Sequence, residues 1–183
     1  MSDETVIRCC APTLAAIKTG SLFNSPFESR KEMTASLRAI NKNLLPKGVC
    51  AMPLRYENGK ALIYLYRPSM LEEDLRNPVA AELLKDAGYP GGSASGHIAW
   101  LIRRLKESET FPHEIGLFLG YPVDDVKGFI EHNACGAKCV GCWKVYGDAV
   151  KAQKQFERFK KCTKVYQKQF ECGRSLTRLT VAR

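Results

Sequence analysis

Apolar residues recur at helical spacing in the segment between residues 26 and 45. They lie three or four positions apart and are separated by charged residues, which is the pattern of an amphipathic helix with one buried face. Ser29 and Glu32 have the spacing of a capping box, so the regular helix is expected to begin there. The apolar positions of this stripe are Met33, Leu37, Ile40 and Leu44.

Start and stop signals predict further helices along the chain. We expect a short helix over residues 2–9 and a second one that begins at Pro12 and ends before Gly20, because a first helical turn tolerates proline. Asp148 is expected to cap a long helix that ends at Gly173. The remaining helices are expected at about 79–87, 98–105, 112–119 and 122–131.

The clearest strand pattern runs from Val49 to Arg67. Asn58 and Gly59 are the pair that a tight hairpin turn requires, because both turn positions need a positive φ. The second arm of the hairpin is apolar on both faces, which predicts the middle of a small sheet. Pro53 cannot donate to a strand ladder, so the first arm is expected to be an edge strand or to carry a bulge.

A second strand signal lies at residues 143–146, where Trp-Lys-Val-Tyr alternates in polarity. We expect it to join the hairpin. The predicted fold class is therefore α+β, with helices packed on a small, mainly antiparallel sheet formed by the hairpin (about 49–67) and this strand (about 143–146). A length of 183 residues fits a single domain, 1–183, with one sizeable core.

The net charge of +9 is concentrated at the end of the sequence. Residues 151–183 contain ten Lys and Arg and only two Glu. This excess of positive charge indicates a nucleic acid or an acidic protein as a candidate partner. No aromatic residues are interleaved with these charges in the manner of an RNA-binding surface, so a solvated helix face is favoured. Nucleic acid is thus a disfavoured partner.

Several classes of protein are excluded by composition. No apolar run approaches the ~20 residues that a membrane span needs, so no membrane partner is expected. The first ten residues lack the basic and apolar regions of a secretory signal, so the protein is expected to be cytoplasmic. Eight cysteines in a reducing compartment favour thiols or metal ligands over disulfides.

The segment Glu114–Ile130 scans like a helix-turn-helix, with Gly120 in the turn. A recognition helix would present its first residues to the DNA polyanion, yet Asp124 and Asp125 occupy that end. We therefore expect a structural corner between two helices, with both aspartates as first-turn partners of the helix dipole.

Four candidate metal ligands follow this corner within eleven residues: His132, Cys135, Cys139 and Cys142. Their side chains are those that bind zinc or an iron–sulfur cluster, and Cys162 is a further candidate ligand. The Cys-x3-Cys-x2-Cys spacing also occurs in radical enzymes that use S-adenosylmethionine, but only 41 residues remain after it, too few for their barrel. A single cysteine triplet lacks the paired halves of a typical zinc module.

A cysteine-dependent enzyme is the second class of function considered. Cys10 precedes the helix expected from Pro12, where unpaired N–H groups would favour its thiolate. His113 would serve as the base, with Glu114 orienting its imidazole. The alternative is that His113 caps a helix or lies exposed after Pro112.

Four segments resemble one bacterial family, a domain of unknown function found mainly in anaerobic Gram-positive bacteria. They are CAPTLAAIKTGSLF (10–23), LIYLYRP (62–68), FPHEIGLFLGYPVDDVKGFI (111–130) and GCWKVYGD (141–148). The resemblance covers nearly the whole chain and implies a single intracellular bacterial domain. It carries no activity and transfers no catalytic residue.

No reaction-specific motif is present, so the sequence leaves the function unknown. The favoured interpretation is a domain that binds a small molecule or a protein partner, with its site near residues 111–148. The alternatives are the enzyme that uses Cys10 and His113, and a metal-binding or nucleic-acid-binding protein.

Overall fold

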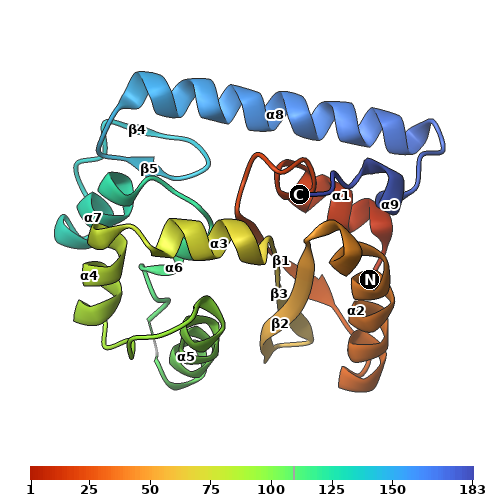
Figure 1. Ribbon diagram of the computed structural model, residues 1–183, viewed down its shortest axis with the longest axis horizontal. Helices are drawn as coiled ribbons and strands as arrows, with labels where there is room; N and C mark the ends of the chain where they lie inside the picture. The colour runs from red at the N-terminus through yellow and green to blue at the C-terminus, as the bar shows by residue number, and fades with distance from the viewer. Residues whose placement is uncertain (109) are drawn as a thin grey trace. The chain divides into compact units, whose positions relative to one another are not determined.

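The computed structural model describes residues 1–108 and 110–183 (Figure 1). Its backbone contacts divide the chain into two compact units, each described by itself below. Unit 1 comprises Met1–Ser69 and Phe159–Arg183, and unit 2 comprises Met70–Arg158. The expectation of a single domain stays a prediction.

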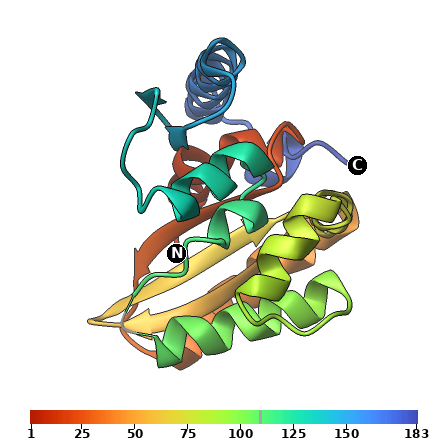
Figure 2. The same ribbon diagram turned by 90° about the vertical axis from the view of Figure 1, so that its left-hand side faces the viewer.

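Unit 1 contains a three-stranded antiparallel sheet in the order β1-β3-β2 (Figure 2). The strands are β1 (Gly20–Pro26), β2 (Cys50–Glu57) and β3 (Lys60–Tyr66). The predicted hairpin is confirmed, since Asn58 and Gly59 join β2 to β3 with φ of 48° and 70°. β3 is the central strand, as its apolar faces predicted. β2 lies at the edge, and its register shifts between Pro53 and Arg55, so the predicted bulge is also confirmed.

The prediction that residues 143–146 join the hairpin is wrong, because another segment is the third strand of this sheet. It is β1, whereas residues 143–146 contribute β5 (Lys144–Val145), which pairs with β4 (Cys139–Val140) in a separate two-stranded sheet of unit 2. The β1 signal is weak because Ser21, Asn24 and Ser25 dilute its apolar pattern. The α+β class is confirmed, with helices and two small antiparallel sheets.

The helices of unit 1 bury their apolar faces in one core. α1 (Asp3–Leu14) packs on β1 and β3, and α2 (Arg30–Leu44) packs on β2. The predicted helix start at Ser29 is confirmed, because the Ser29 hydroxyl caps α2 by accepting a hydrogen bond from the Glu32 N–H at 3.2 Å. The core is formed by Val6, Ile7, Cys10, Leu14, Phe23, Met33, Leu37, Ile40, Leu44, Val49, Ala51, Ala61, Ile63, Leu65, Leu176 and Leu179.

The expectation of two helices at the start of the chain is wrong. This segment is one continuous helix, α1, that begins after its cap Ser2 and contains Pro12 in its last turn. The C-terminal segment forms the short helix α9 (Leu176–Leu179), capped by Ser175. In both places the serine cap sets the start of the helix.

Arg67 ties several backbone segments of unit 1 together. Its guanidinium is fully buried and donates to the carbonyl oxygens of Thr13 at 2.6 Å and of Leu14 and Val181 at 2.7 Å. A longer bond of 3.2 Å reaches the carbonyl of Lys47, the last residue of the single turn η1 (Leu45–Lys47). The end of α1, the turn η1 and the C-terminal segment are therefore held by one side chain.

Unit 2 is mainly helical. Its helices are α3 (Pro68–Leu75, whose first two residues belong to unit 1), α4 (Pro78–Asp86), α5 (Ala94–Glu107), α6 (Ile115–Phe118), α7 (Val123–Glu131) and the first part of α8 (Ala149–Glu171). Asn77 caps α4 through a 2.9 Å bond from the Val79 N–H. No described helix of the chain is long and apolar enough to cross a membrane. The Lys and Arg side chains of α8 are exposed.

We predict that Arg67→Met lowers the free energy of unfolding by about 3 kcal/mol, because it removes the charge-assisted hydrogen bonds that the guanidinium donates to backbone carbonyls of unit 1. Urea denaturation followed by circular dichroism measures this change. Arg38→Met, which removes an exposed arginine of α2 in the same unit, is the control and is expected to change stability by less than about 0.5 kcal/mol. Equal effects of the two variants would contradict the role given to Arg67.

Candidate functional site

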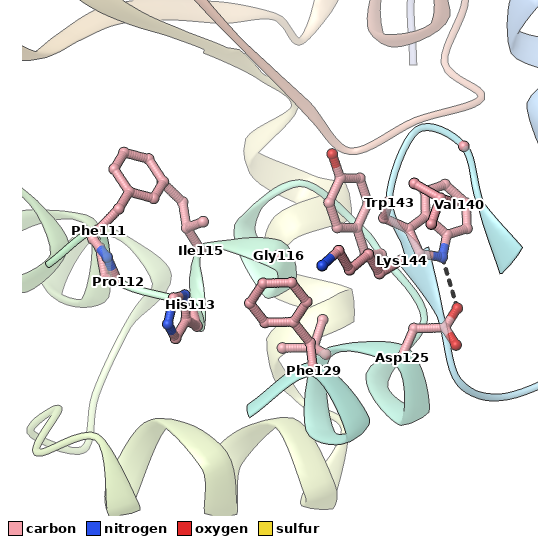
Figure 3. Close-up of a pocket in the computed structure, with 13 residues that line it drawn as sticks. Phe111, Pro112, His113, Ile115, Gly116, Asp125, Phe129, Val140, Trp143 and Lys144 are labelled. Carbon is pink, nitrogen blue, oxygen red and sulfur yellow. Dashed lines mark hydrogen bonds between the residues drawn. The ribbon is translucent and has the colours of Figure 1, made fainter. Parts of the chain in front are cut away.

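A cavity of about 290 Å³ lies within unit 2, and all its lining residues fall between positions 111 and 148 (Figure 3). Its wall comes from the loop before α6, from α6 and α7, and from the β4–β5 hairpin. The lining residues are Phe111, Pro112, His113, Ile115, Gly116, Tyr121, Asp125, Val126, Phe129, Val140, Gly141, Trp143 and Lys144. The segment singled out by the sequence thus surrounds one pocket.

The corner between α6 and α7 forms one side of this pocket. α6 has only four residues, and Gly120 turns the chain after it with a φ of 70°. A Cβ atom at Gly116 would lie 2.8 Å from the Val126 side chain, so glycine is what lets the two short helices approach. The helix-turn-helix resemblance therefore comes from a tight structural corner, as expected.

Asp125 connects this corner to the β5 strand. Its carboxylate is buried and accepts three hydrogen bonds of 2.7 Å, from the Trp143 indole Nε1–H and from the backbone N–H groups of Tyr146 and Gly147. Asp125 lies in the first turn of α7, as expected, but its side chain also points inward to these donors. Its neighbour Asp124 is exposed in the first turn of α7.

Aromatic rings form part of the pocket wall. Tyr121 stacks on Trp143 with ring centroids 4.9 Å apart, and the Phe156 ring meets Trp143 edge-on at 4.5 Å. At the other end, the His113 and Phe129 rings meet edge to face, with their centroids 5.0 Å apart. Burial raises the pKa of Tyr121 to about 12, so its hydroxyl stays neutral near pH 7 and donates to the Cys142 carbonyl at 3.2 Å.

Lys144 supplies a cationic group to this aromatic wall. Its Nζ donates to the Ala134 carbonyl at 2.7 Å and lies 5.8 Å from the centre of the Phe129 ring. Figure 3 shows the side chain extending from β5 over Phe129. Among the residues that the structure describes, Lys144 forms no ion pair. The pocket is therefore apolar, with one ammonium group directed into it.

Comparison with known proteins identifies one family. A model of the family described as "Protein of unknown function (DUF3793)" matches residues 6–180. The chain belongs to this family. The resemblance inferred from four segments is confirmed, and it carries no activity. No curated protein and no solved structure matches the chain.

The four predicted metal ligands do not gather into a site in the part of the chain that the structure describes, where no three His, Cys, Asp or Glu side chains are placed to hold a metal ion. His132 stacks on the Tyr146 ring at 5.6 Å. Cys135 and Cys142 are exposed thiols, and Cys139 is a half-buried thiol on β4. A metal at these residues stays a prediction that this arrangement does not support.

The premise for a reactive Cys10 is wrong. Because α1 begins at Asp3, Cys10 lies in the interior of that helix and not at its N-terminus. Its thiol is fully buried in the core of unit 1, and burial raises its pKa, which disfavours the thiolate. These observations count against Cys10 as a nucleophile.

The proposed partners of Cys10 lie in unit 2. His113 lines the pocket and contacts Phe129. Glu114 is buried beside it, where it accepts a hydrogen bond from the Tyr89 hydroxyl at 3.0 Å and pairs with the Arg104 Nε at 2.8 Å. The Glu114 carboxylate therefore joins the loop after α4 to α5. A catalytic role of Cys10, His113 and Glu114 stays a prediction.

Sequence reasoning missed the polar groups that shape the pocket, Asp125 and Lys144. The signal in each case was ambiguous, because an aspartate in a first helical turn is ordinarily a dipole partner and a lysine in a short strand ordinarily faces solvent. The partners of Asp125 lie 18 to 22 residues further along the chain. Only the tertiary structure brings these groups together.

We predict that iodoacetamide alkylates Cys10 in the native protein at least ~100-fold more slowly than Cys135 and Cys142, because its thiol is buried and protonated. Mass spectrometry of peptides from timed reactions at pH 7.5 measures the rates. Unfolding in urea should bring the three rates together. A native rate for Cys10 above that of the exposed cysteines would instead support the enzyme hypothesis.

We also predict that Asp125→Ala lowers the free energy of unfolding by roughly 2–4 kcal/mol, because three buried donors lose their acceptor. The tryptophan fluorescence of Trp143 should shift at the same time, since its indole N–H is released. Asp124→Ala is the matched control, with an exposed carboxylate one residue earlier, and should change stability by less than about 0.5 kcal/mol. Denaturation curves that do not separate the two variants would refute the role of Asp125.

Proposed function

We propose that the protein is a ligand-binding domain that holds a small, largely apolar molecule in the pocket of unit 2. The observation that carries this proposal is the cavity itself, formed by aromatic and aliphatic side chains with a few polar groups at defined places. Sites for small organic molecules have this composition, and a volume of about 290 Å³ lies just below the range of roughly 300–1,000 Å³ that they occupy. A compact ligand is therefore expected.

Exposed apolar side chains at the pocket support the same function. Val140 is 71% exposed and Phe111 is 44% exposed, although both line the cavity. Large apolar side chains that are left open beside a cavity gain free energy when a ligand covers them. A bound molecule would shield both residues from water.

Two arrangements favour binding over catalysis at this pocket. The Asp125 carboxylate, which is the acidic group in the wall, has both oxygens occupied by N–H donors, so it is poorly placed to accept a proton from a ligand. The Tyr121 hydroxyl is neutral and already donates to a backbone carbonyl. These groups support the wall of a preformed cavity.

The test uses uncharged aromatic probes, beginning with 2-naphthalenemethanol, titrated into ¹⁵N-labelled protein. We predict saturable shifts of backbone resonances that cluster at α6, α7 and the β4–β5 hairpin. Val140→Ser should weaken binding several-fold, because a ligand that covers the exposed valine side chain gains about 1 kcal/mol. Val150→Ser is the matched control, an exposed valine of α8 outside the cavity, and should leave the affinity unchanged.

Two results would contradict the proposal. One is that no probe in the set produces saturable shifts. The other is that the shifts cluster away from the cavity and that Val140→Ser and Val150→Ser behave alike. A protein partner that covers Phe111 and Val140 would then be the better explanation of their exposure.

A further inference from the structure

We infer that the molecule bound in this pocket is a carboxylate, and that Lys144 is the residue that binds its charged group. This inference rests on the proposed ligand-binding function and adds the chemical class of the ligand. The expected ligand has a compact apolar body against the aromatic wall and a single anionic group beside Lys144.

The hydrogen bonds of Lys144 leave donors for a ligand. A lysine ammonium carries three N–H donors, and within the described residues one of them is used, for the Ala134 carbonyl at 2.7 Å. That bond fixes the position of the Nζ atom at the cavity wall, above Phe129 (Figure 3). An ammonium that is already held in place loses little further freedom when an anion binds, which favours affinity.

The charges around Lys144 make an anion its natural partner. The acidic group of the wall, Asp125, is occupied by Trp143 and by two backbone N–H groups. The nearby acid of α7, Glu131, pairs with Lys127 at 3.7 Å. A half-buried ammonium among aromatic rings has lost part of its hydration, and a distance of 5.8 Å to the Phe129 ring is at the limit of a cation–π contact. An anionic ligand would restore the lost stabilisation.

The same arrangement selects a carboxylate over a phosphate. Phosphate groups carry more charge and are held by several cationic side chains or by the N–H groups of a glycine-rich loop. Here the wall offers one lysine, and the N–H of Gly141 in the hairpin is already bonded to the Trp143 carbonyl at 3.0 Å. One ammonium in an apolar cavity matches a group with a single negative charge.

The experiment compares two probes that share one ring system, 2-naphthoate and 2-naphthalenemethanol. Isothermal titration at pH 7.5 measures both affinities for the full chain. We predict that the protein binds 2-naphthoate at least ~10-fold more tightly than the alcohol, because the carboxylate gains a charge-assisted hydrogen bond. Lys144→Met should abolish this preference by weakening the naphthoate complex, while the affinity for the alcohol changes little.

Lys138→Met is the matched control. Lys138 also donates its Nζ to a backbone carbonyl at 2.7 Å, that of Gly147, in the same region of unit 2, but it does not line the cavity. This variant should keep the tenfold preference. Lys144→Arg retains the charge and should keep most of the preference, which separates a loss of charge from a loss of folding, and the ¹⁵N spectrum of each variant checks its fold.

The outcomes distinguish a failure of the carboxylate inference from a failure of the proposed ligand-binding function. If both probes bind the protein equally, or if Lys144→Met keeps the preference, the inference is overturned and the binding function stands. If neither probe binds, both are overturned. A preference that is lost equally in Lys138→Met would show that Lys144 is not the determinant.

Discussion

The buried carboxylate of Asp125 is the constraint on which the pocket of unit 2 depends. It accepts three short hydrogen bonds, one from the indole of Trp143 and two from the backbone that follows β5. These bonds hold the β4–β5 hairpin against α7. Because Trp143 and Lys144 are neighbours in the hairpin, the same bonds position both the aromatic wall and the ammonium group. A single carboxylate thus determines the shape and the charge of the cavity.

Unit 1 is stabilised in a similar way by a buried side chain of the opposite charge. The buried guanidinium of Arg67 donates to backbone carbonyls at the end of α1, beside η1 and in the C-terminal segment. In both units a buried ionic side chain satisfies backbone groups that no regular element pairs. Buried charges are tolerated when their hydrogen bonds are complete, and each of these residues joins segments that are distant in sequence.

The elements with local signals were predicted well from sequence. The hairpin follows from Asn58 and Gly59, whose positive φ angles a tight turn requires. The capped helix α2 follows from Ser29, and the bulge follows from Pro53. In each case a short stretch of residues is sufficient to predict the local structure.

The features that depend on tertiary contacts were not predictable in this way. β1 has three polar residues among seven and is a strand because it pairs with β3. Cys10 was placed at a helix start because Pro12 was interpreted as a first-turn residue, whereas the helix begins at Asp3 and continues through Pro12. The pocket was located by its segment, but the inward direction of Asp125 and Lys144 depends on partners many residues away.

The most direct test of the carboxylate site is a crystal structure of the protein with 2-naphthoate. We predict that the naphthalene ring lies between Phe129 and Trp143, with a carboxylate oxygen about 2.8 Å from the Lys144 Nζ, the usual length of a charge-assisted bond. The Asp125 hydrogen bonds should be unchanged, because the cavity is preformed. A ligand bound elsewhere, or one whose carboxylate points away from Lys144 into solvent, would contradict this prediction.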